Sequence, residues 1–327
     1  MRNPHTSRGK RATSLLALAL VALLAWTLAA CGPAATPQSV GYYDQGVAAY
    51  SKGDYAQAIA NFDKAIELDP QYANAYHNRG IAYANKGNLD QAIADLNKAI
   101  ELAPQDVPSY YDRGIAYAAK GDYDQAIVDY GKAIELDPKS TNAYLNRGIA
   151  YANKGNLDQA IADYGKAIEL DPQAANAYAN RGIAYANKGN YNQVITDFTR
   201  VIELDPKSAP AYSSRAAAYR NQGNDDQAIV DSNRAVELDP QYAKAYYNRA
   251  LAYADKHSYD QALADYDKAI QLDPKFAFAY YNRGLAYKLQ GLNAQAIQDF
   301  ETYLQLDPTA ADRVVVEQTI SQLQSVP

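Results

Sequence analysis

The chain repeats one short pattern with a strict period. The eleven residues NRGIAYANKGN occur three times without change, at 78–88, 146–156 and 180–190, so their starting points differ by 68 and then by 34. A strict period of this length predicts a one-dimensional array in which each unit contacts only its neighbours. Without insertion or deletion the chain divides into eight consecutive units of the shorter interval: 39–72, 73–106, 107–140, 141–174, 175–208, 209–242, 243–276 and 277–310.

Each unit has the pattern of two amphipathic helices joined by a short turn. In the second unit Tyr76, Gly80 and Tyr83 share one face of a first helix at intervals of three and four residues. Gly87 suits the left-handed end of that helix, and Pro104 ends the second one. The second helix carries its apolar face at Leu89, Ala92, Ile93, Leu96, Ala99 and Ile100. One unit cannot bury such a stripe alone, so the units are expected to stack into a solenoid.

These positions resemble the tetratricopeptide repeat (TPR) family over 272 of the 327 residues. The aromatic residue early in the first helix is Tyr in all eight units, and the small residue four positions later is Gly in six units and Ala in two. The second-helix pattern of the family is met by Ala92, Leu96, Ala99 and Pro104. The resemblance implies an all-α, right-handed superhelical solenoid of eight repeats. After Ala310 an apolar stripe of Val315, Val316, Ile320 and Leu323 predicts a C-terminal capping helix within 311–327.

An Arg stands in the first helix of seven units where the family usually has Leu, and an Asp stands in the second helix of the same seven. The first unit has Gln45 and Asn61 at these two positions, so both change together. This coupling favours an ion pair between the two helices of one unit, such as Arg79 with Asp95 and Arg147 with Asp163. The alternative is two unrelated charges facing solvent, which would contribute about 0–1 kcal/mol.

Departures from the repeat predict a weak point. The sixth unit has Ser232 at an apolar second-helix position and Asp225 where most other units have Tyr or Leu. The seventh unit has His257 in place of the turn Gly. A left-handed turn at that site would cost a non-Gly residue about 1 kcal/mol.

The first 38 residues read as an export signal and a tether. Four basic residues precede an apolar core, and Leu28-Ala29-Ala30-Cys31 resembles a bacterial lipobox. We therefore expect a lipoprotein signal peptide over 1–30, lipidation of Cys31 with a chain such as palmitate, and a tether over 31–38. An uncleaved signal anchor is the alternative, because the apolar stretch 12–30 is just long enough to span a bilayer.

Composition leaves little material for catalysis or for nucleic acid binding. The chain has one Cys and three His, and no phosphate-binding loop or nucleophile elbow is present. Without residues 1–30 it has 27 basic and 37 acidic residues, a net charge of −10. Nucleic acid binding needs clustered Lys and Arg instead. We expect no enzymatic activity, no cofactor, no metal and no nucleic acid partner.

In TPR proteins the first helices line a concave surface on which extended peptides commonly bind. By that resemblance an Asn ladder would follow the groove, and Asn amides can bind a peptide backbone without reading its sequence. The ladder consists of Asn78, Asn146, Asn180, Asn248 and Asn282. Further Asn residues flank it at 74, 142, 176, 85, 153, 187 and 221. The alternative is that Asn is a structural choice of the repeat.

The predicted groove becomes aromatic and cationic near its C-terminal end, at Lys244, Tyr247, Phe278, Tyr281 and Lys288. Aromatic side chains beside positive charge are typical of binding hot spots. They could equally cover the end of the array. In the first case Tyr247→Ala and Tyr281→Ala would weaken binding with little effect on stability.

The sequence therefore predicts a non-enzymatic protein interaction scaffold that is lipid-anchored in the bacterial cell envelope, at the outer membrane or cell surface. Its partners would be protein segments bound in the concave groove. The alternative is a structural or self-associating envelope component without a peptide ligand.

Overall fold

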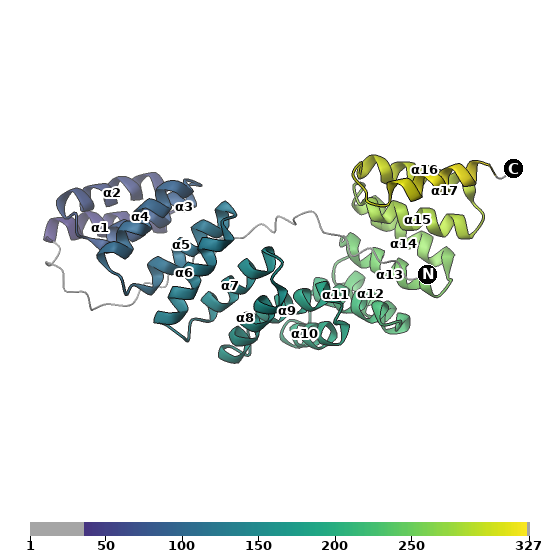
Figure 1. Cartoon of the computed structure of the whole chain (residues 1–327), viewed down its shortest axis with the longest axis horizontal. Helices are drawn as coiled ribbons and strands as arrows, with labels where there is room; N and C mark the ends of the chain where they lie inside the picture. Colours follow the sequence, from purple (N-terminus) through teal and green to yellow (C-terminus); the bar gives the residue numbers. More distant parts are fainter. Residues whose placement is uncertain (1–35, 326–327) are drawn as a thin grey trace. The chain divides into compact units, whose positions relative to one another are not determined.

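The computed structural model describes residues 36–325, and this part of the chain is all α-helical, with 17 helices (Figure 1). The all-α class predicted from the sequence is confirmed. The chain forms two compact bodies, each made of several repeats, and from here on a unit means one of these bodies. The first unit ends at Leu170 and the second begins at Asp171.

The first unit holds four helix pairs. Its helices are α1 (Pro37–Ser51), α2 (Tyr55–Leu68), α3 (Ala73–Asn85), α4 (Leu89–Leu102), α5 (Val107–Lys120), α6 (Tyr123–Leu136), α7 (Thr141–Asn153) and α8 (Leu157–Leu170). The second unit holds four more pairs and a last helix. These are α9 (Ala175–Asn187), α10 (Tyr191–Leu204), α11 (Ala209–Asn221), α12 (Asp225–Leu238), α13 (Ala243–Asp255), α14 (Tyr259–Leu272), α15 (Ala277–Leu289), α16 (Asn293–Leu306) and α17 (Arg313–Gln324).

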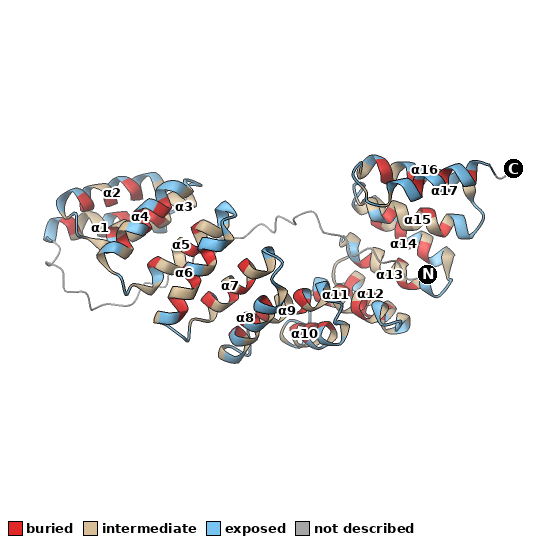
Figure 2. Ribbon diagram, in the orientation of Figure 1, coloured by how far each residue is buried: buried red, intermediate tan, exposed pale blue. Residues whose placement is uncertain are grey.

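Each pair consists of an odd-numbered helix A and an even-numbered helix B that pack against each other, and helix B then packs on the next helix A of its unit. Buried residues follow the sides on which the helices pair, and exposed residues follow the outer sides (Figure 2). Neighbouring helices A also contact one another, as α1 with α3 and α11 with α13 do, whereas helices B make no comparable contact in the described residues. Each unit therefore curves with its helices A on the inner side.

A left-handed residue separates helix A from helix B in every pair. Seven of these residues are Gly, for example Gly121 with φ 82°. The eighth is His257, with φ 59°, so the left-handed conformation predicted there is confirmed. Its ring lies beside Tyr259, whose hydroxyl is 2.9 Å from His257 Nδ1.

The two helices of a repeat approach most closely where a Gly of helix A meets an aromatic ring of helix B. A Cβ on Gly148 would lie 2.7 Å from the ring of Tyr164, so only Gly fits at this distance. The same arrangement joins Gly46 to Phe62, Gly114 to Tyr130, Gly182 to Phe198 and Gly284 to Phe300. The small residue and the large ring are thus a matched pair.

The sixth repeat lacks this pair. Ala216 stands at the Gly position and Ser232 at the ring position, where Ser232 is fully buried. Its Oγ has no hydrogen-bond partner in the described structure, and neither does Oδ1 of Asp225. Burial, and next the charge of Asp255, raise the pKa of the Asp225 carboxyl. These unsatisfied polar groups agree with the low stability of the sixth repeat that the sequence indicates.

Helix α17 closes the second unit. Its residues Val316, Ile320 and Leu323 are buried in one cluster with Phe300, Tyr303 and Leu304 of α16. Val315, expected in the same stripe, is instead exposed. Val316, Ile320 and Leu323 follow one another at intervals of four and three residues and share one face, whereas Val315 is one residue, about 100°, away from that face.

Candidate binding face and the network beneath it

Seven Arg–Asp pairs join helix A to helix B of the same repeat. In the fourth repeat Arg147 donates from Nε to Oδ2 of Asp163 at 2.7 Å and from Nη2 to Oδ1 at 2.8 Å. The other bidentate pairs are Arg79 with Asp95, Arg113 with Asp129, Arg181 with Asp197, Arg215 with Asp231, Arg249 with Asp265, and Arg283 with Asp299.

These pairs are largely removed from water. The Asp side chains are 1–10% exposed and the Arg side chains 15–22%. The hydrogen bonds from Arg147 to Asp163 raise the pKa of the guanidinium in spite of the opposing effect of burial. The structure thus brings together the side chains that the sequence pairs, in a desolvated setting and not as separate surface charges.

In five of the seven pairs the Arg also reaches the preceding repeat, a contact that the sequence did not predict. Arg79 Nη1 donates to Oδ1 of Asp63 on the previous helix B at 2.6 Å. In the sequence this contact is marked by a polar residue two positions after the Asp position of the preceding helix B, which is Asn61 in the first repeat. Equivalent bonds run from Arg113 to Asn97, Arg215 to Thr199, Arg249 to Asn233 and Arg283 to Asp267.

A Tyr of the same helix A lies against each of these Arg residues. The guanidinium carbon of Arg147 is 5.6 Å from the ring centre of Tyr144, and the six other pairs have distances of 5.4–5.7 Å to the Tyr three residues earlier. This is the distance of a cation–π contact. The aromatic residue that marks every repeat therefore supports the Arg that links the two helices.

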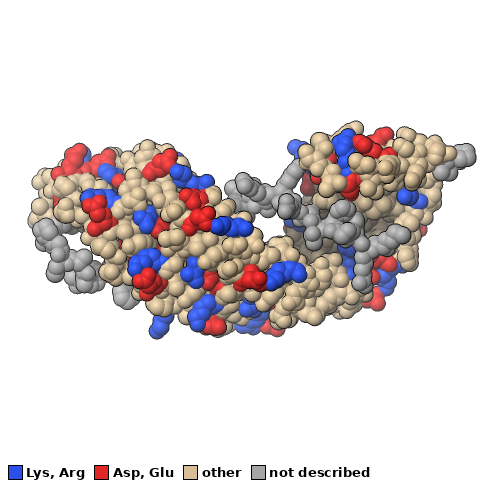
Figure 3. All heavy atoms as spheres, in the orientation of Figure 1, with Lys and Arg blue, Asp and Glu red and all other residues tan. Residues whose placement is uncertain are grey.

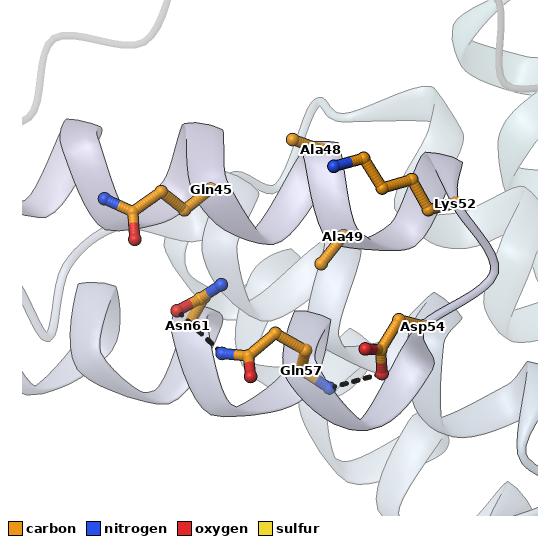
Figure 4. Close-up of a pocket in the computed structure, with 7 residues that line it drawn as sticks. All are labelled: Gln45, Ala48, Ala49, Lys52, Asp54, Gln57 and Asn61. Atoms are coloured by element: carbon orange, nitrogen blue, oxygen red, sulfur yellow. Dashed lines mark hydrogen bonds between the residues drawn. The ribbon is translucent and has the colours of Figure 1, made fainter.

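The first repeat differs from the other seven in having two neutral amides where they have Arg and Asp. Gln45 of α1 and Asn61 of α2 face a hollow of about 380 Å³ between the two helices (Figure 4). There Gln57 donates from Nε2 to Oδ1 of Asn61 at 3.3 Å. This repeat therefore has neutral amides at the place where the other repeats have an ion pair.

The Asn ladder lies between neighbouring helices A. Asn78 donates to the hydroxyl of Tyr43 in the previous helix A at 2.8 Å. Asn146 donates to Tyr111 at 2.7 Å and Asn282 to Tyr247 at 3.0 Å. Asn248 donates instead to the backbone carbonyl and the hydroxyl of Ser213. Among the described residues Asn180 makes no such bond. Four of the five ladder amides are thus engaged in joining repeats.

One of these contacts between neighbouring helices A is formed by ionisable side chains. Where other such contacts have Tyr and Asn, α3 has His77 and α5 has Asp112, with His77 Nε2 2.7 Å from Oδ2 of Asp112. Burial alone would lower the pKa of the imidazole. The hydrogen bond and charge of Asp112 outweigh it, with help from Asp106 and Asn78, so the pKa of His77 is raised above its usual value.

Most of the flanking Asn residues are open to solvent, but Asn85 is half-buried and donates to the hydroxyl of Tyr50 in the previous helix A at 2.9 Å. Asn142, Asn153, Asn176, Asn187 and Asn221 are all exposed on helices A. The side chains of Asn153 and Asn221 bond the carbonyl four residues earlier in their own helix, a contact that joins no repeats. These residues, more than the ladder, present amide groups on the inner side.

Two of the predicted aromatic anchors are packing residues. Tyr247 lies between Tyr266, at 6.1 Å between ring centres, and Phe276, at 4.6 Å, and burial raises its pKa to about 12. Tyr281 packs on Phe300 and Tyr303. The expectation that Tyr247→Ala and Tyr281→Ala would leave stability nearly unchanged is therefore corrected, since each ring fills space between helices.

Three other residues of the predicted C-terminal site are open. Phe278, Lys244 and Lys288 are exposed on α15 and α13. The ring of Phe278 has one neighbouring ring, Tyr303, at 6.1 Å.

No group of three or more His, Cys, Asp or Glu side chains within 36–325 is arranged to hold a metal ion. Over the same range no helix is both long and apolar enough to span a bilayer. On the side of the molecule shown in Figure 3, acidic and basic side chains are interspersed. Cys31 and the rest of the predicted signal lie outside the described residues.

Comparison with protein families gives matches along the array. The model described as TPR repeat matches residues 46–87, 116–155, 151–189 and 216–257. Three models described as tetratricopeptide repeat match 252–321, then 73–106 and 175–208, then 96–128 and 198–230. A search of curated proteins finds no match.

Solved structures with the same fold include a tetratricopeptide repeat protein from Parabacteroides merdae. It is 21% identical, with a TM-score of 0.56 over 78% of this chain and 98% of that one. A chain of the APC/C hetero-tetramer Cut9–Hcn1 is 18% identical, with a TM-score of 0.58 over 82% of this chain and 52% of that one.

YrrB, described as a TPR protein with an unusual peptide-binding site, is 26% identical. Its TM-score is 0.51 over 57% of this chain and 97% of that one. The family matches follow the repeats from residue 46 to residue 321 and agree with the paired helices of both units. The chain belongs to the tetratricopeptide repeat family.

Proposed function

We propose that the protein is a non-enzymatic scaffold that binds segments of other proteins along its helix A face. The observation that carries this proposal is the row of exposed Asn side chains on the inner side, such as Asn142 and Asn176, beside ladder amides that already join the repeats. Exposed amides offer donors and an acceptor to a peptide backbone.

The family supports the same function. TPR proteins are generally interaction scaffolds, and the similar structure of YrrB is described as having a peptide-binding site. The comparison is with the fold and the exposed face and identifies no partner.

We also propose that the scaffold is a lipoprotein of the bacterial cell envelope, anchored through Cys31 on the outer side of the membrane. The support is the sequence Leu28-Ala29-Ala30-Cys31 after an apolar core. Mass spectrometry of the purified protein, beside Cys31→Ala, tests this part. An unmodified Cys31 on an intact N-terminus would reject lipidation and favour a signal anchor.

Binding is tested by affinity capture from envelope extract with the full chain as bait. The variant Asn142→Arg/Asn176→Arg places large cations on the exposed inner positions. The matched control Ala162→Arg/Thr196→Arg changes exposed helix B residues instead. We expect proteins held by the parent and the control to be lost by the inner-face variant. Equal capture by all three would reject the inner face. If nothing is captured and the chain self-associates, it is a structural envelope component.

A further inference from the structure

The last repeat differs from the others of its unit at three exposed positions, two on α15 and one in the turn that follows it. Phe278 and Leu292 are 38% exposed and Leu289 is 65% exposed. The corresponding residues of the fifth repeat, three periods earlier, are polar: Asn176, Asn187 and Asn190. We call Phe278, Lys288, Leu289 and Leu292 the α15 patch.

Two members of the α15 patch, Phe278 and Leu289, share one side of α15. Phe278 and Leu289 are eleven residues apart, about three turns and 16 Å along the axis, and point in nearly the same direction. Leu292 follows in the turn before α16, three residues after Leu289. The patch therefore places exposed apolar side chains at both ends of α15, with Lys288 beside Leu289.

The capping helix does not explain the stripe. Helix α17 buries Phe300, Tyr303 and Leu304 of α16 beneath Val316, Ile320 and Leu323. The α15 patch remains exposed with α17 in place. Other residues therefore cover the end of the array, and the α15 patch is free to contact a molecule other than the described part of this chain.

Both Lys and Asp side chains occupy the patch and the equivalent part of the preceding repeat, and the two Asp carboxylates already accept hydrogen bonds. Lys288 belongs to it, and Lys244 of α13 holds the position of Phe278 in the preceding repeat. Within 36–325 neither Lys makes an ion pair. Asp255, at the Leu289 position of the preceding repeat, is neutralised by Arg220 at 2.7 Å. On the turn side Asp260 accepts a bond from Gln290 at 2.7 Å.

We propose that the α15 patch is the docking site for an acidic peptide segment with apolar side chains on one side, which places its carboxylates near Lys244 and Lys288. This rests on the proposed scaffold function and deepens it. The concave inner side of the unit favours a narrow peptide over a flat membrane. Apolar side chains in the centre with charges at the rim are the usual arrangement of an energetically important contact.

The test uses dye-labelled 16-residue probes and fluorescence anisotropy with the full chain. The first probe has Leu at every third or fourth position and Glu between. The second replaces Glu with Lys, and the third replaces Leu with Ser. We expect the parent to bind the first probe and to bind the other two at least about tenfold more weakly.

The matched variant is Phe278→Asn/Leu289→Asn/Leu292→Asn, which installs the residues of the fifth repeat. The control Val230→Asn changes an exposed apolar residue of helix B. Because all these side chains are exposed, we expect folding to be kept, which circular dichroism checks. The triple variant should lose about tenfold or more in affinity, and the control should not change.

Every other outcome rejects the proposal. Equal binding by the triple variant would place the peptide elsewhere on the inner face and leave the scaffold function intact. No binding of any probe would reject the patch, and the capture experiment would then decide separately whether the scaffold function also fails. Patch-dependent dimers in sedimentation would identify a second copy as the occupant. Patch-dependent binding to phosphatidylglycerol vesicles in place of peptide would identify a lipid surface.

Discussion

Arg147 and Gly131 face each other between two neighbouring repeats without a bond. Nη1 of Arg147 lies 3.7 Å from the point where a Cβ of residue 131 would stand. In the second and eighth repeats the same Arg atom meets an Asp at that position, Asp63 or Asp267, at 2.6 Å. The contact between the third and fourth repeats therefore lacks a hydrogen bond that five other pairs of neighbouring repeats have.

Gly131→Asp should stabilise the first unit by supplying this acceptor. Gly131→Ala is the control, since replacing Gly inside a helix contributes about 0.5–1 kcal/mol by itself. We expect Asp to match or exceed Ala in the free energy of unfolding by urea, although its helix propensity is lower. A value for Asp clearly below that for Ala would contradict the proposed bond.

The Arg147–Asp163 pair should show strong coupling in a double-mutant cycle. Arg147→Leu or Asp163→Ala alone leaves one largely buried charge, at a cost of about 3–5 kcal/mol. The double variant should recover much of this. Additive free energies of unfolding would mean that the two charges act independently.

Ser232→Ala should stabilise the sixth repeat by about 1 kcal/mol, because it removes a buried hydroxyl without a partner. Ser213 is the matched control, since its buried hydroxyl accepts a bond from Asn248. Thermal unfolding of Ser213→Ala should show a loss. If both variants change stability in the same direction, the hydroxyl of Ser232 has a partner such as water.

His257→Gly should stabilise the chain by about 1 kcal/mol, because φ of 59° is unfavourable for a residue with a Cβ. The contact with Tyr259 opposes this gain. Comparison with His257→Ala in chemical denaturation separates the two effects, since Ala removes the contact and keeps the strain. A lower stability of the Gly variant than of the Ala variant would contradict the assignment.

The joint of His77 and Asp112 should strengthen in acid. The folded-state pKa of His77 is raised, so its stabilisation is fully present below the unfolded pKa of about 6.5 and is lost as pH rises through the folded value. The control is His77→Tyr/Asp112→Asn, which copies Tyr43 with Asn78. The difference in unfolding free energy between parent and control should fall from pH 6 to pH 9. A difference that is constant over this range would show that His77 does not titrate there.

The period made the fold predictable, and the paired exchange at Gln45 and Asn61 indicated which charges meet. Contacts between repeats were harder to predict. The same residue type recurs at equivalent positions of many repeats, so the sequence does not show which of them touches a neighbouring repeat. Tyr43 and Asn78 are an example. The sequence left the role of Tyr247 open for a related reason: an aromatic on the inner side of a helix can fill the space between two repeats as well as meet a ligand.

The Arg side chains give the array a direction. Of the seven Arg residues that pair with an Asp, five bond to the repeat before their own, and none of the seven bonds to the repeat after it in the described residues. Detaching a repeat from the amino end of a unit would leave a largely buried guanidinium short of one acceptor. Detaching one from the carboxyl end would leave only an acceptor such as Asp63 or Asp267, which water already reaches. Fraying from the carboxyl end thus disturbs less, and it is at that end that the second unit has its extra helix, α17.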